Sequence, residues 1–312
     1  MTSTILDRRV VGVVGLGAMG SRLAERLFPA GYEVHGFNRT PGRAPWLDEL
    51  GMKRDHSPCE LATTSDIIVM MLWDSDAVRG TVLGDDGILA GARPGTIIVD
   101  LSTIEPSASA EIAAVAKSRG VDYLDCPVSG SLDRAESGEL LVMAGGDPRV
   151  LELVLPVLGM LARRIIHVGN RNGSGLALKL AINQQVATQL VGWGEAIALT
   201  DRFGIDRSLA STIMLDSVIA SPMLHYRVPF SFEPPDEVWA SAAQLRKDVA
   251  YAQEITSDRA RSSAIALELL DAVLADGRGD LEAVELLAEA RDRAGAGAGA
   301  GVDQRTLEWV SP

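Results

Sequence analysis

The sequence predicts an α/β fold in which an N-terminal doubly wound domain is joined by a long helix to a C-terminal all-α domain. Three observations lead to this prediction. Short β-branched runs alternate with helical segments as far as about residue 170. Such alternation is typical of βαβ units, whose parallel sheet is covered by helices on both faces. Beyond residue 170 strand-like runs stop, and a helix-forming stretch opens at Gly173 and Gly175.

The elements follow in order along the chain. Helices are expected at 18–29, at 106–120 and, as the joining element, from 173 to about 203. Strands are expected at 10–15, 32–38, 66–72, 96–102, 121–130, 139–146 and 164–169. We therefore divide the chain into an α/β domain (1–170), an all-helical domain (171–294) and a flexible Gly/Ala-rich tail (295–312).

Composition limits the partners that this chain can have. A formal net charge of -13 over 312 residues disfavours nucleic acid and anionic membranes, because both require a basic face. The two cysteines form no spaced pair and the four histidines are scattered, so neither a disulfide scaffold nor a metal site is expected. No apolar run reaches the ~18 residues of a membrane span. The N-terminal segment is interpreted as mature protein rather than a signal peptide, and the protein as cytoplasmic.

A glycine-rich turn follows the first expected strand directly. The stretch VVGLGAMG places Gly15, Gly17 and Gly20 in the G-x-G-x-x-G spacing, between a strand and a helix. The first glycine permits a tight turn, the second lets the backbone approach a pyrophosphate, and the third allows close helix packing. A glycine turn without a ligand is the alternative. The context favours a Rossmann-type dinucleotide site formed by Gly15, Leu16, Gly17, Ala18, Met19 and Gly20.

The end of the second strand indicates which dinucleotide binds. A carboxylate there would accept hydrogen bonds from the ribose hydroxyls of NAD, but this chain has Asn38, Arg39 and Thr40. An arginine beside two small polar groups can bind a 2′-phosphate in bidentate fashion. NADP(H) is therefore favoured as the cofactor. NAD(H) is the alternative, with Arg39 then only an exposed loop residue.

Four motifs together resemble the β-hydroxyacid dehydrogenase family. They are GLGAMG near the start, DCPVSGS at 125–131, GSGLALKLAIN at 173–183 and RKD at 246–248. The family includes 3-hydroxyisobutyrate dehydrogenases, tartronate semialdehyde reductases and glyoxylate/succinic semialdehyde reductases. The resemblance extends to about residue 293, with the motifs in the family's order and spacing.

The resemblance implies roles for particular residues. Lys179 matches the catalytic lysine of the family, and the segments with Leu72 and Thr103 match those that line the dinucleotide. The residues expected at the substrate are Ser129, Gly130, Ser131, Asn183 and Lys247, of which Lys247 would also approach the cofactor.

The chemistry of these residue types agrees with the implied roles. Lys179 and Asn183 are four positions apart and share one helix face. Lys179 is also the only charged residue between Leu176 and Gly194. Desolvation would bring its pKa toward neutrality, so that it could protonate the alkoxide formed when a carbonyl receives hydride. The alternative is a lysine that extends from a core helix into solvent.

Some positions depart from the family pattern. Ser131 and Arg134 replace glycines that the family usually has, and Trp73 replaces a proline. Arg134 could pair with a second acidic group of the substrate, or with Asp133 or Glu136. These changes favour a small aldehyde or keto acid other than the 3-hydroxyisobutyrate pair. Trp193 is attributed to core packing.

The prediction is therefore an NADP(H)-dependent oxidoreductase that interconverts a small β-hydroxy acid, bound by its carboxylate, and the corresponding semialdehyde or keto acid. An imine reductase is one alternative, although those enzymes usually lack both the lysine and the serine–glycine loop. A catalytically silent nucleotide-binding protein is the other. Residues 1–170 would then form the NAD(P)-binding Rossmann domain, and residues 171–294 the substrate and dimerisation domain. The active site is expected between the two domains, and the assembly is expected to be a homodimer, with a tetramer as the alternative.

Overall fold

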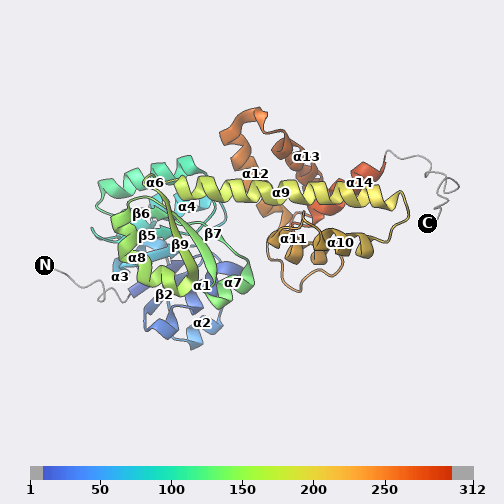
Figure 1. Cartoon of the computed structure of the whole chain (residues 1–312). Coiled ribbons are helices and arrows are strands. Elements are labelled where there is room, and N and C mark those ends of the chain that lie inside the picture. Colours follow the sequence, from blue (N-terminus) through green and yellow to red (C-terminus); the bar gives the residue numbers. More distant parts are fainter. Residues whose placement is uncertain (1–9, 297–312) are drawn as a thin grey trace. The chain divides into compact units, whose positions relative to one another are not determined.

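The computed structural model describes residues 10–296 and divides into two compact units between Leu180 and Ala181 (Figure 1). This division falls ten residues after the expected boundary near 170. The first turns of helix α9 (Ser174–Asp201) belong to the first unit, because Leu176 is fully buried in a core cluster of that unit. The expectations for the N-terminal segment before residue 10 and for the tail beyond residue 296 lie outside the described residues.

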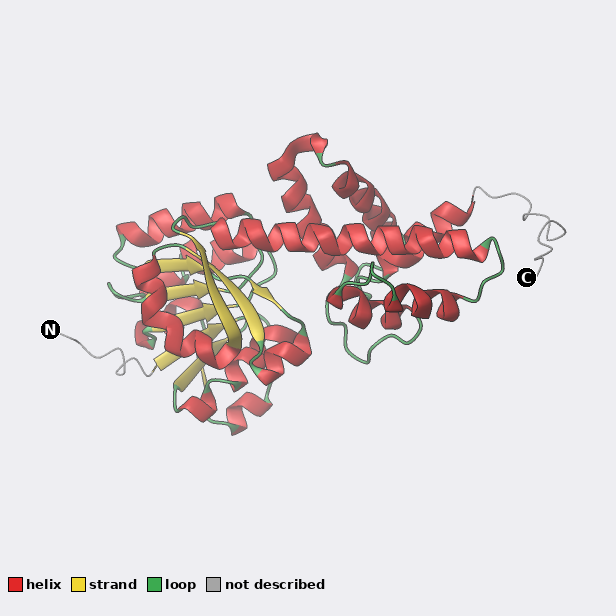
Figure 2. Cartoon of the chain, viewed as in Figure 1, coloured by secondary structure: helices red, strands yellow, loops and turns green. Residues whose placement is uncertain are grey.

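The first unit is a twisted sheet with helices on both faces, as Figure 2 shows. The strand order is β3-β2-β1-β4-β5-β6-β8-β7, and β9 also pairs with β8. Pairing is parallel from β3 to β6, which confirms the predicted doubly wound core. The strands are β1 Val10–Val14, β2 Glu33–Phe37, β3 Lys53–Arg54, β4 Ile67–Met70, β5 Ile97–Asp100, β6 Asp122–Asp125, β7 Val128–Ser129, β8 Leu140–Gly145 and β9 Ala162–Gly169.

Part of the sheet differs from the sequence-based expectation. The expected strand at 121–130 is two strands, β6 and β7, separated at Cys126 and Pro127, and proline has no N–H for a sheet ladder. Strand β8 runs antiparallel to both β6 and β7, which the expectation of a parallel sheet did not include. The two-residue strand β3 was not predicted, because a pair of charged residues carries no strand pattern.

The central strands are buried on both faces, and alternate residues enter different cores. Ile67 and Val69 of β4 pack in one cluster, while Ile68 and Met70 pack in the other. This follows from the two-residue period of a strand. Core residues from α1, α2, α7 and α8 cover one face, and residues from α3, α4, α5 and α6 cover the other.

The helices of the first unit begin at recognisable capping residues. Asp74 and Asp147 accept hydrogen bonds from backbone N–H groups at the starts of α4 and α8, which would otherwise lack partners. The helical segments are α1 Ala18–Glu25, η2 Phe28–Ala30, α2 Trp46–Glu49, α3 Pro58–Thr64, α4 Ser75–Leu83, α5 Ile88–Gly91, α6 Pro106–Ser118, α7 Leu132–Ser137 and α8 Pro148–Leu161.

The second unit is helical. Its described residues contain one isolated β-bridge, between Ser241 and Glu282. Its core includes Trp193, which is 3% exposed, so the attribution of this tryptophan to core packing is confirmed. Besides the remainder of α9, the segments are α10 Arg207–Asp216, α11 Pro222–Arg227, η3 Val228–Ser231, α12 Ala242–Thr256, η4 Ser257–Arg259, α13 Arg261–Ala275 and α14 Glu285–Ala296.

Candidate active site

The glycine loop lies at the carboxyl end of β1. Gly15 has φ of +94°, a conformation that favours glycine. A Cβ added to Gly20 would lie 1.8 Å from the Gly15 carbonyl oxygen, so α1 can approach the loop only with glycine there. No heavy atom lies within 4 Å of a Cβ added to Gly17, and α1 begins at the next residue without a side-chain cap. Open space in front of uncapped helix N–H groups fits the pyrophosphate of a dinucleotide.

Asn38 connects this loop to the end of β2. Its Oδ1 accepts a hydrogen bond from the Leu16 N–H at 2.8 Å, and its Nδ2 donates to the Thr40 carbonyl oxygen at 2.8 Å. A carboxylate here could accept the first bond but could not donate the second. Asn38 therefore holds the backbone of both segments, while Arg39 and Thr40 are exposed beside it.

Leu72 follows β4 and lies beside the glycine loop. A Cβ built on Gly15 would be 3.0 Å from Leu72 Cδ2. The Leu72 N–H donates to the Ser102 hydroxyl at 2.9 Å, and Ser102 directly precedes Thr103, after β5. The carboxyl ends of neighbouring parallel strands thus bring these segments to the same edge of the sheet, where dinucleotides bind in such folds.

The PVSG segment forms β7 and the turn after it. Gly130 has φ of +129°, and a Cβ there would lie 2.9 Å from Arg134 Cβ. Ser129 and Ser131 are half-buried, and Gly130 is exposed. Arg134 pairs with Glu139 and lies 3.9 Å from Asp133. The expected alternative partner Glu136 lies 3.9 Å from Arg22 instead, and residues two positions apart on a helix do not face each other.

The start of α9 is attached to the end of β6. Asp125 Oδ1 accepts from the Gly173 N–H at 2.7 Å, and Oδ2 accepts from Gly175 N at 3.0 Å and Leu176 N at 3.3 Å. Lys179 lies one turn beyond Gly175 and is half-buried, so it is less desolvated than the apolar sequence around it suggested. Sequence reasoning had assigned no role to Asp125, although it opens the DCPVSGS motif.

Asp248 holds two predicted substrate residues in the second unit. Asn183 Nδ2 donates to Asp248 Oδ2 at 2.6 Å, and Lys247 Nζ donates to Asp248 Oδ1 at 2.6 Å. The carboxylate is almost fully buried and the Lys247 side chain is 13% exposed, with its ammonium 5.0 Å from the centre of the Tyr251 ring. The amide of Asn183 has two N–H groups, so the bond to Asp248 orients the other one. Asp248 was noted in the RKD motif, but its bond to Asn183 was not expected.

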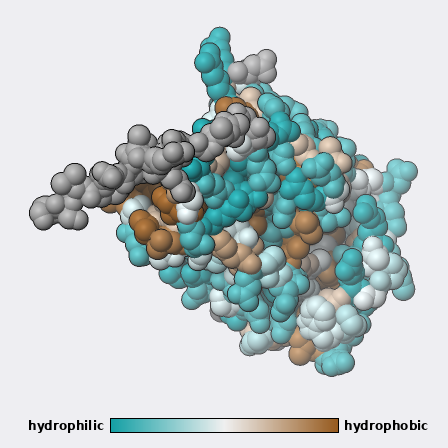
Figure 3. Space-filling view, turned by 90° about the vertical axis from the view of Figure 1, so that its right-hand side faces the viewer, coloured by the Kyte–Doolittle hydropathy of each residue, from teal (hydrophilic) through white to brown (hydrophobic). Residues whose placement is uncertain are grey.

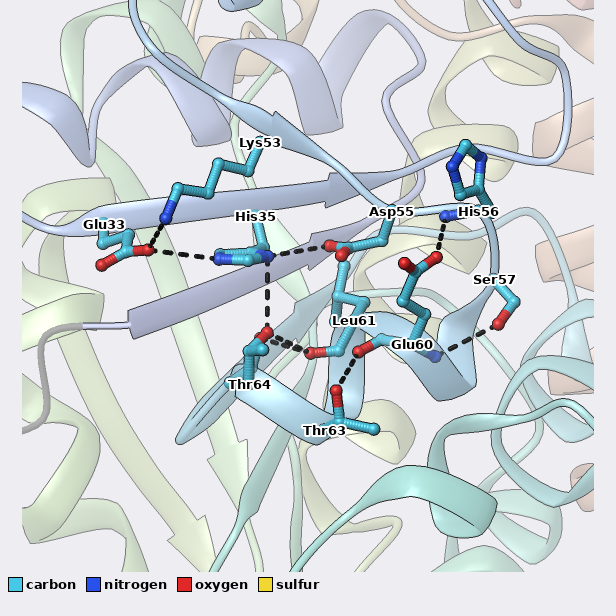
Figure 4. Close-up of polar contacts among 11 residues, drawn as sticks. Glu33, His35, Lys53, Asp55, His56, Ser57, Glu60, Leu61, Thr63 and Thr64 are labelled. Atoms are coloured by element: carbon cyan, nitrogen blue, oxygen red, sulfur yellow. Dashed lines mark hydrogen bonds and ion pairs between the residues drawn. The ribbon is translucent and has the colours of Figure 1, made fainter.

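A second polar cluster lies at β2, β3 and α3 (Figure 4). His35 Nδ1 lies 3.0 Å from Asp55 Oδ2, and burial is the largest cause that raises the pKa of Asp55. Ser57, the N-cap of α3, accepts from the Glu60 N–H at 3.1 Å, and Glu60 accepts from the His56 N–H at 2.6 Å. This differs from a capping box, in which the glutamate would accept from the N–H of the N-cap residue itself. These contacts join β2, β3 and the start of α3, so we assign this cluster to the stability of the fold.

Two further features concern metals and membranes. Among the side chains that the structure describes, no three His, Cys, Asp or Glu residues gather as ligands of a metal ion would. Among the helices within residues 10–296, none has both the length and the apolar character required to cross a membrane.

The doubly wound sheet and the glycine loop at the end of β1 are typical of a dinucleotide-binding protein. Comparison with known proteins agrees. Residues 10–169 match the NAD binding domain of 6-phosphogluconate dehydrogenase. The chain is 32% identical to the NAD-dependent L-serine dehydrogenase of Pseudomonas aeruginosa, over 86% of this chain and 93% of that enzyme. It is 30% identical to glyoxylate/succinic semialdehyde reductase 2 of Arabidopsis thaliana, over 82% and 71%.

Solved structures give the same result. The 3-hydroxyisobutyrate dehydrogenase of Mycobacterium tuberculosis, solved with L-serine, has a TM-score of 0.80 at 28% identity and covers 91% of this chain and 99% of its own. An imine reductase from Myxococcus stipitatus with NADP+ has a TM-score of 0.62 at 23% identity, covering 89% and 98%, which indicates a shared fold alone. The chain belongs to the β-hydroxyacid dehydrogenase family and is an NAD(P)-dependent oxidoreductase.

Proposed function

We propose that the protein interconverts a small β-hydroxy acid and the corresponding semialdehyde or keto acid, with NADP(H) as the cofactor and Lys179 as the proton donor. The observation that carries the proposal is the position of Lys179. It lies one turn along α9, and the start of that helix is hydrogen-bonded to Asp125. The PVSG segment begins two residues after Asp125, so one strand end supplies both the helix anchor and the expected carboxylate loop.

Each group has a defined role in this reaction. The Ser129 hydroxyl and the N–H groups of Gly130 and Ser131 bind the substrate carboxylate. Asn183 donates its second amide N–H to the substrate, and Lys247 adds positive charge. The nicotinamide supplies the hydride when bound. Lys179 donates a proton to the developing alkoxide, and in the reverse direction it accepts the proton of the hydroxyl group.

The choice of cofactor rests on the end of β2. The Asn38 side chain is hydrogen-bonded to the backbone of Leu16 and Thr40. Because this side chain is neutral, no carboxylate is present at this position to repel a 2′-phosphate. Arg39 is exposed in the same turn, where its guanidinium can reach a phosphate. These features support NADP(H) over NAD(H).

The test is a paired fluorescence titration with NADPH and NADH, followed by kinetics. L-serine and 3-hydroxyisobutyrate are assayed with NADP+, and glyoxylate and succinic semialdehyde with NADPH. We expect tighter binding of NADPH, turnover of at least one carboxylate substrate, and a loss of about 10²- to 10⁴-fold in kcat for Lys179→Ala. Full activity of that variant would refute the role of the lysine. Reduction of a cyclic imine instead would favour the imine reductase alternative.

We also infer that a second copy of the chain covers an apolar surface of the second unit. Figure 3 shows brown patches that interrupt an otherwise mostly hydrophilic face. Leu199, Phe203, Leu209, Ile213 and Ile219 are each more than half exposed, and exposed apolar side chains in this number are typical of an interface. Light scattering should give a dimer mass that Leu209→Glu with Ile213→Glu lowers. A monomer in the unaltered protein would refute this inference, and a tetramer would require a second interface.

A further inference from the structure

Two carboxylates that the proposed reaction does not use lie at the ends of neighbouring strands. Asp100 ends β5, Asp125 ends β6, and the two are register partners. Each is only 1% exposed. Charged side chains are almost never buried to this extent unless they are paired. Their hydrogen-bond partners therefore indicate what these residues do.

Asp125 provides hydrogen-bond acceptors for the backbone N–H groups at the start of α9. The N–H groups of the first turn of a helix have no acceptor within the helix. Its two oxygens accept from three backbone N–H groups at residues 173, 175 and 176, and also from the Ser109 hydroxyl at 3.3 Å. Burial is the largest cause that raises the pKa of Asp125, whereas these backbone N–H groups lower it. A negative charge at this end of α9 is also stabilised by the helix dipole.

The start of α9 packs closely against the sheet beside the Asp125 carboxylate. A Cβ on Gly175 would lie 2.1 Å from the Met143 carbonyl oxygen and 3.0 Å from Asp125 Oδ2. A Cβ on Gly145 of β8 would lie 2.6 Å from the same Oδ2. The backbone of α9 is thus in direct contact with the sheet at the point where Asp125 binds it. The position of Lys179, one turn further along α9, therefore depends on this contact.

The second buried carboxylate, Asp100, is hydrogen-bonded toward the cofactor edge of the sheet. Asp100 Oδ1 accepts from the Ser102 N–H at 2.9 Å, and the Ser102 hydroxyl accepts from the Leu72 N–H at 2.9 Å. On the other side, the Tyr123 hydroxyl lies 2.6 Å from Asp100 Oδ2. The Ser109 hydroxyl donates to Asp125 Oδ1 at 3.3 Å. The hydrogen bonds of Asp100 therefore reach the expected cofactor segment at Leu72, those of Asp125 reach the start of α9, and the two carboxylates lie on paired residues of β5 and β6.

We propose that Asp125 is a positioning residue for catalysis. Its bonds set the rotation and the axial position of the first turns of α9 relative to the cofactor edge of the sheet, and thereby the position of the Lys179 ammonium. This inference rests on the proposed role of Lys179. Because a proton donor must lie within hydrogen-bonding reach of the reacting oxygen, a displacement of about 1 Å can reduce the rate about 10²-fold.

The test compares Asp125→Asn with Asp122→Asn. Asparagine keeps the shape of the side chain, but its Nδ2 would face N–H donors instead of accepting from them. Asp122 is on the same strand and pairs at the surface with Lys117 at 3.0 Å, so it is a matched control. We expect faster hydrogen exchange in residues 173–180 of Asp125→Asn, an unchanged affinity for NADPH, and a kcat per NADPH-binding site about 10²-fold lower. The pH profile of kcat should also move, and the control should behave as wild type.

The outcomes separate positioning from stability. If Asp125→Asn only destabilised the fold, the number of NADPH-binding sites would fall, while kcat per site and its pH profile would stay as in wild type. That result would overturn the proposal. If that variant does not fold, Ser109→Ala removes one bond to the carboxylate and should give a smaller loss in kcat per site; no loss would overturn the proposal. Lys179→Ala is measured alongside. Its full activity would refute the proposed function, whereas the exchange data report on the anchor alone.

Discussion

Replacing Asp100 by asparagine should change how the stability of the first unit depends on pH. Asp100 Oδ1 accepts from the Ser102 N–H, and Oδ2 contacts the Tyr123 hydroxyl. An asparagine amide can accept the first bond and donate the second, so the variant resembles the protonated form of Asp100. Burial is the largest cause that raises the pKa of Asp100, and the charge of Asp125 adds to it, while the hydrogen bonds from Ser102 and Tyr123 lower it.

The sign follows from the raised pKa. In the unfolded chain the carboxyl has a pKa of about 3.9. Above that pH the unfolded chain releases the proton, while the folded protein retains it up to the higher native pKa of Asp100. In this window the native state binds one more proton, so the free energy of unfolding falls as pH rises. The contribution of Asp100 is fully present below pH ~3.9 and is lost above its native pKa.

The magnitude is limited by the single proton involved. One proton corresponds to a slope of at most about 1.4 kcal/mol per pH unit. Since the asparagine side chain of the variant cannot titrate, the free energy of unfolding of Asp100→Asn minus that of wild type should increase with pH by up to this amount per unit within the window.

Urea unfolding between pH 4 and pH 8, followed by circular dichroism, measures this difference. The transition of the first unit is identified by its shift on addition of NADPH, because a ligand stabilises the unit that binds it. Asp122→Asn is the control. A difference between variant and wild type that stays constant over the whole pH range would show that Asp100 is ionised in the folded protein throughout, and would refute the reasoning.

Four other substitutions test the site and the fold. Gly20→Ala should destabilise the first unit by about 1–3 kcal/mol, seen as a lower melting temperature, because its Cβ would collide with the Gly15 carbonyl oxygen; an unchanged melting temperature would contradict this packing. Gly17→Ala should have the melting temperature of wild type, since its Cβ would meet open space. It should bind NADPH about tenfold more weakly, a loss of ~1.4 kcal/mol, and equal affinity in the titration would argue against pyrophosphate binding at Gly17. Arg39→Ala should weaken NADPH binding by about 1.5–3 kcal/mol and leave NADH binding unchanged, and an equal loss for both cofactors would exclude a phosphate contact. Ser57→Ala removes the cap of α3 and should cost about 1 kcal/mol in urea unfolding, with cofactor affinity as the control.

The strand–turn–helix form of the glycine loop could be predicted from the sequence because its rules are local. Gly15, Gly17 and Gly20 lie within six residues, and strand–turn–helix geometry requires small residues at those positions. Likewise, the buried strands could be predicted because residues that are apolar on both faces form continuous β-branched runs. The long α9 was predicted from 173 to about 203 and extends from Ser174 to Asp201.

The tertiary structure decided which residues hold the site residues in place. Asp125 meets the start of α9 48 residues further along, and Asp248 meets Asn183 across 65 residues. The periodicity of apolar residues along the sequence does not indicate such pairs, since they depend on which elements pack against each other. The antiparallel direction of β8 and the late division of the chain after Leu180 have the same origin. By itself, then, the sequence determined the chemical groups and the order of the elements, because both depend on neighbours within one or two turns. The position of Lys179 and the orientation of Asn183 depend on buried carboxylates far away in the chain, which only packing brings to them.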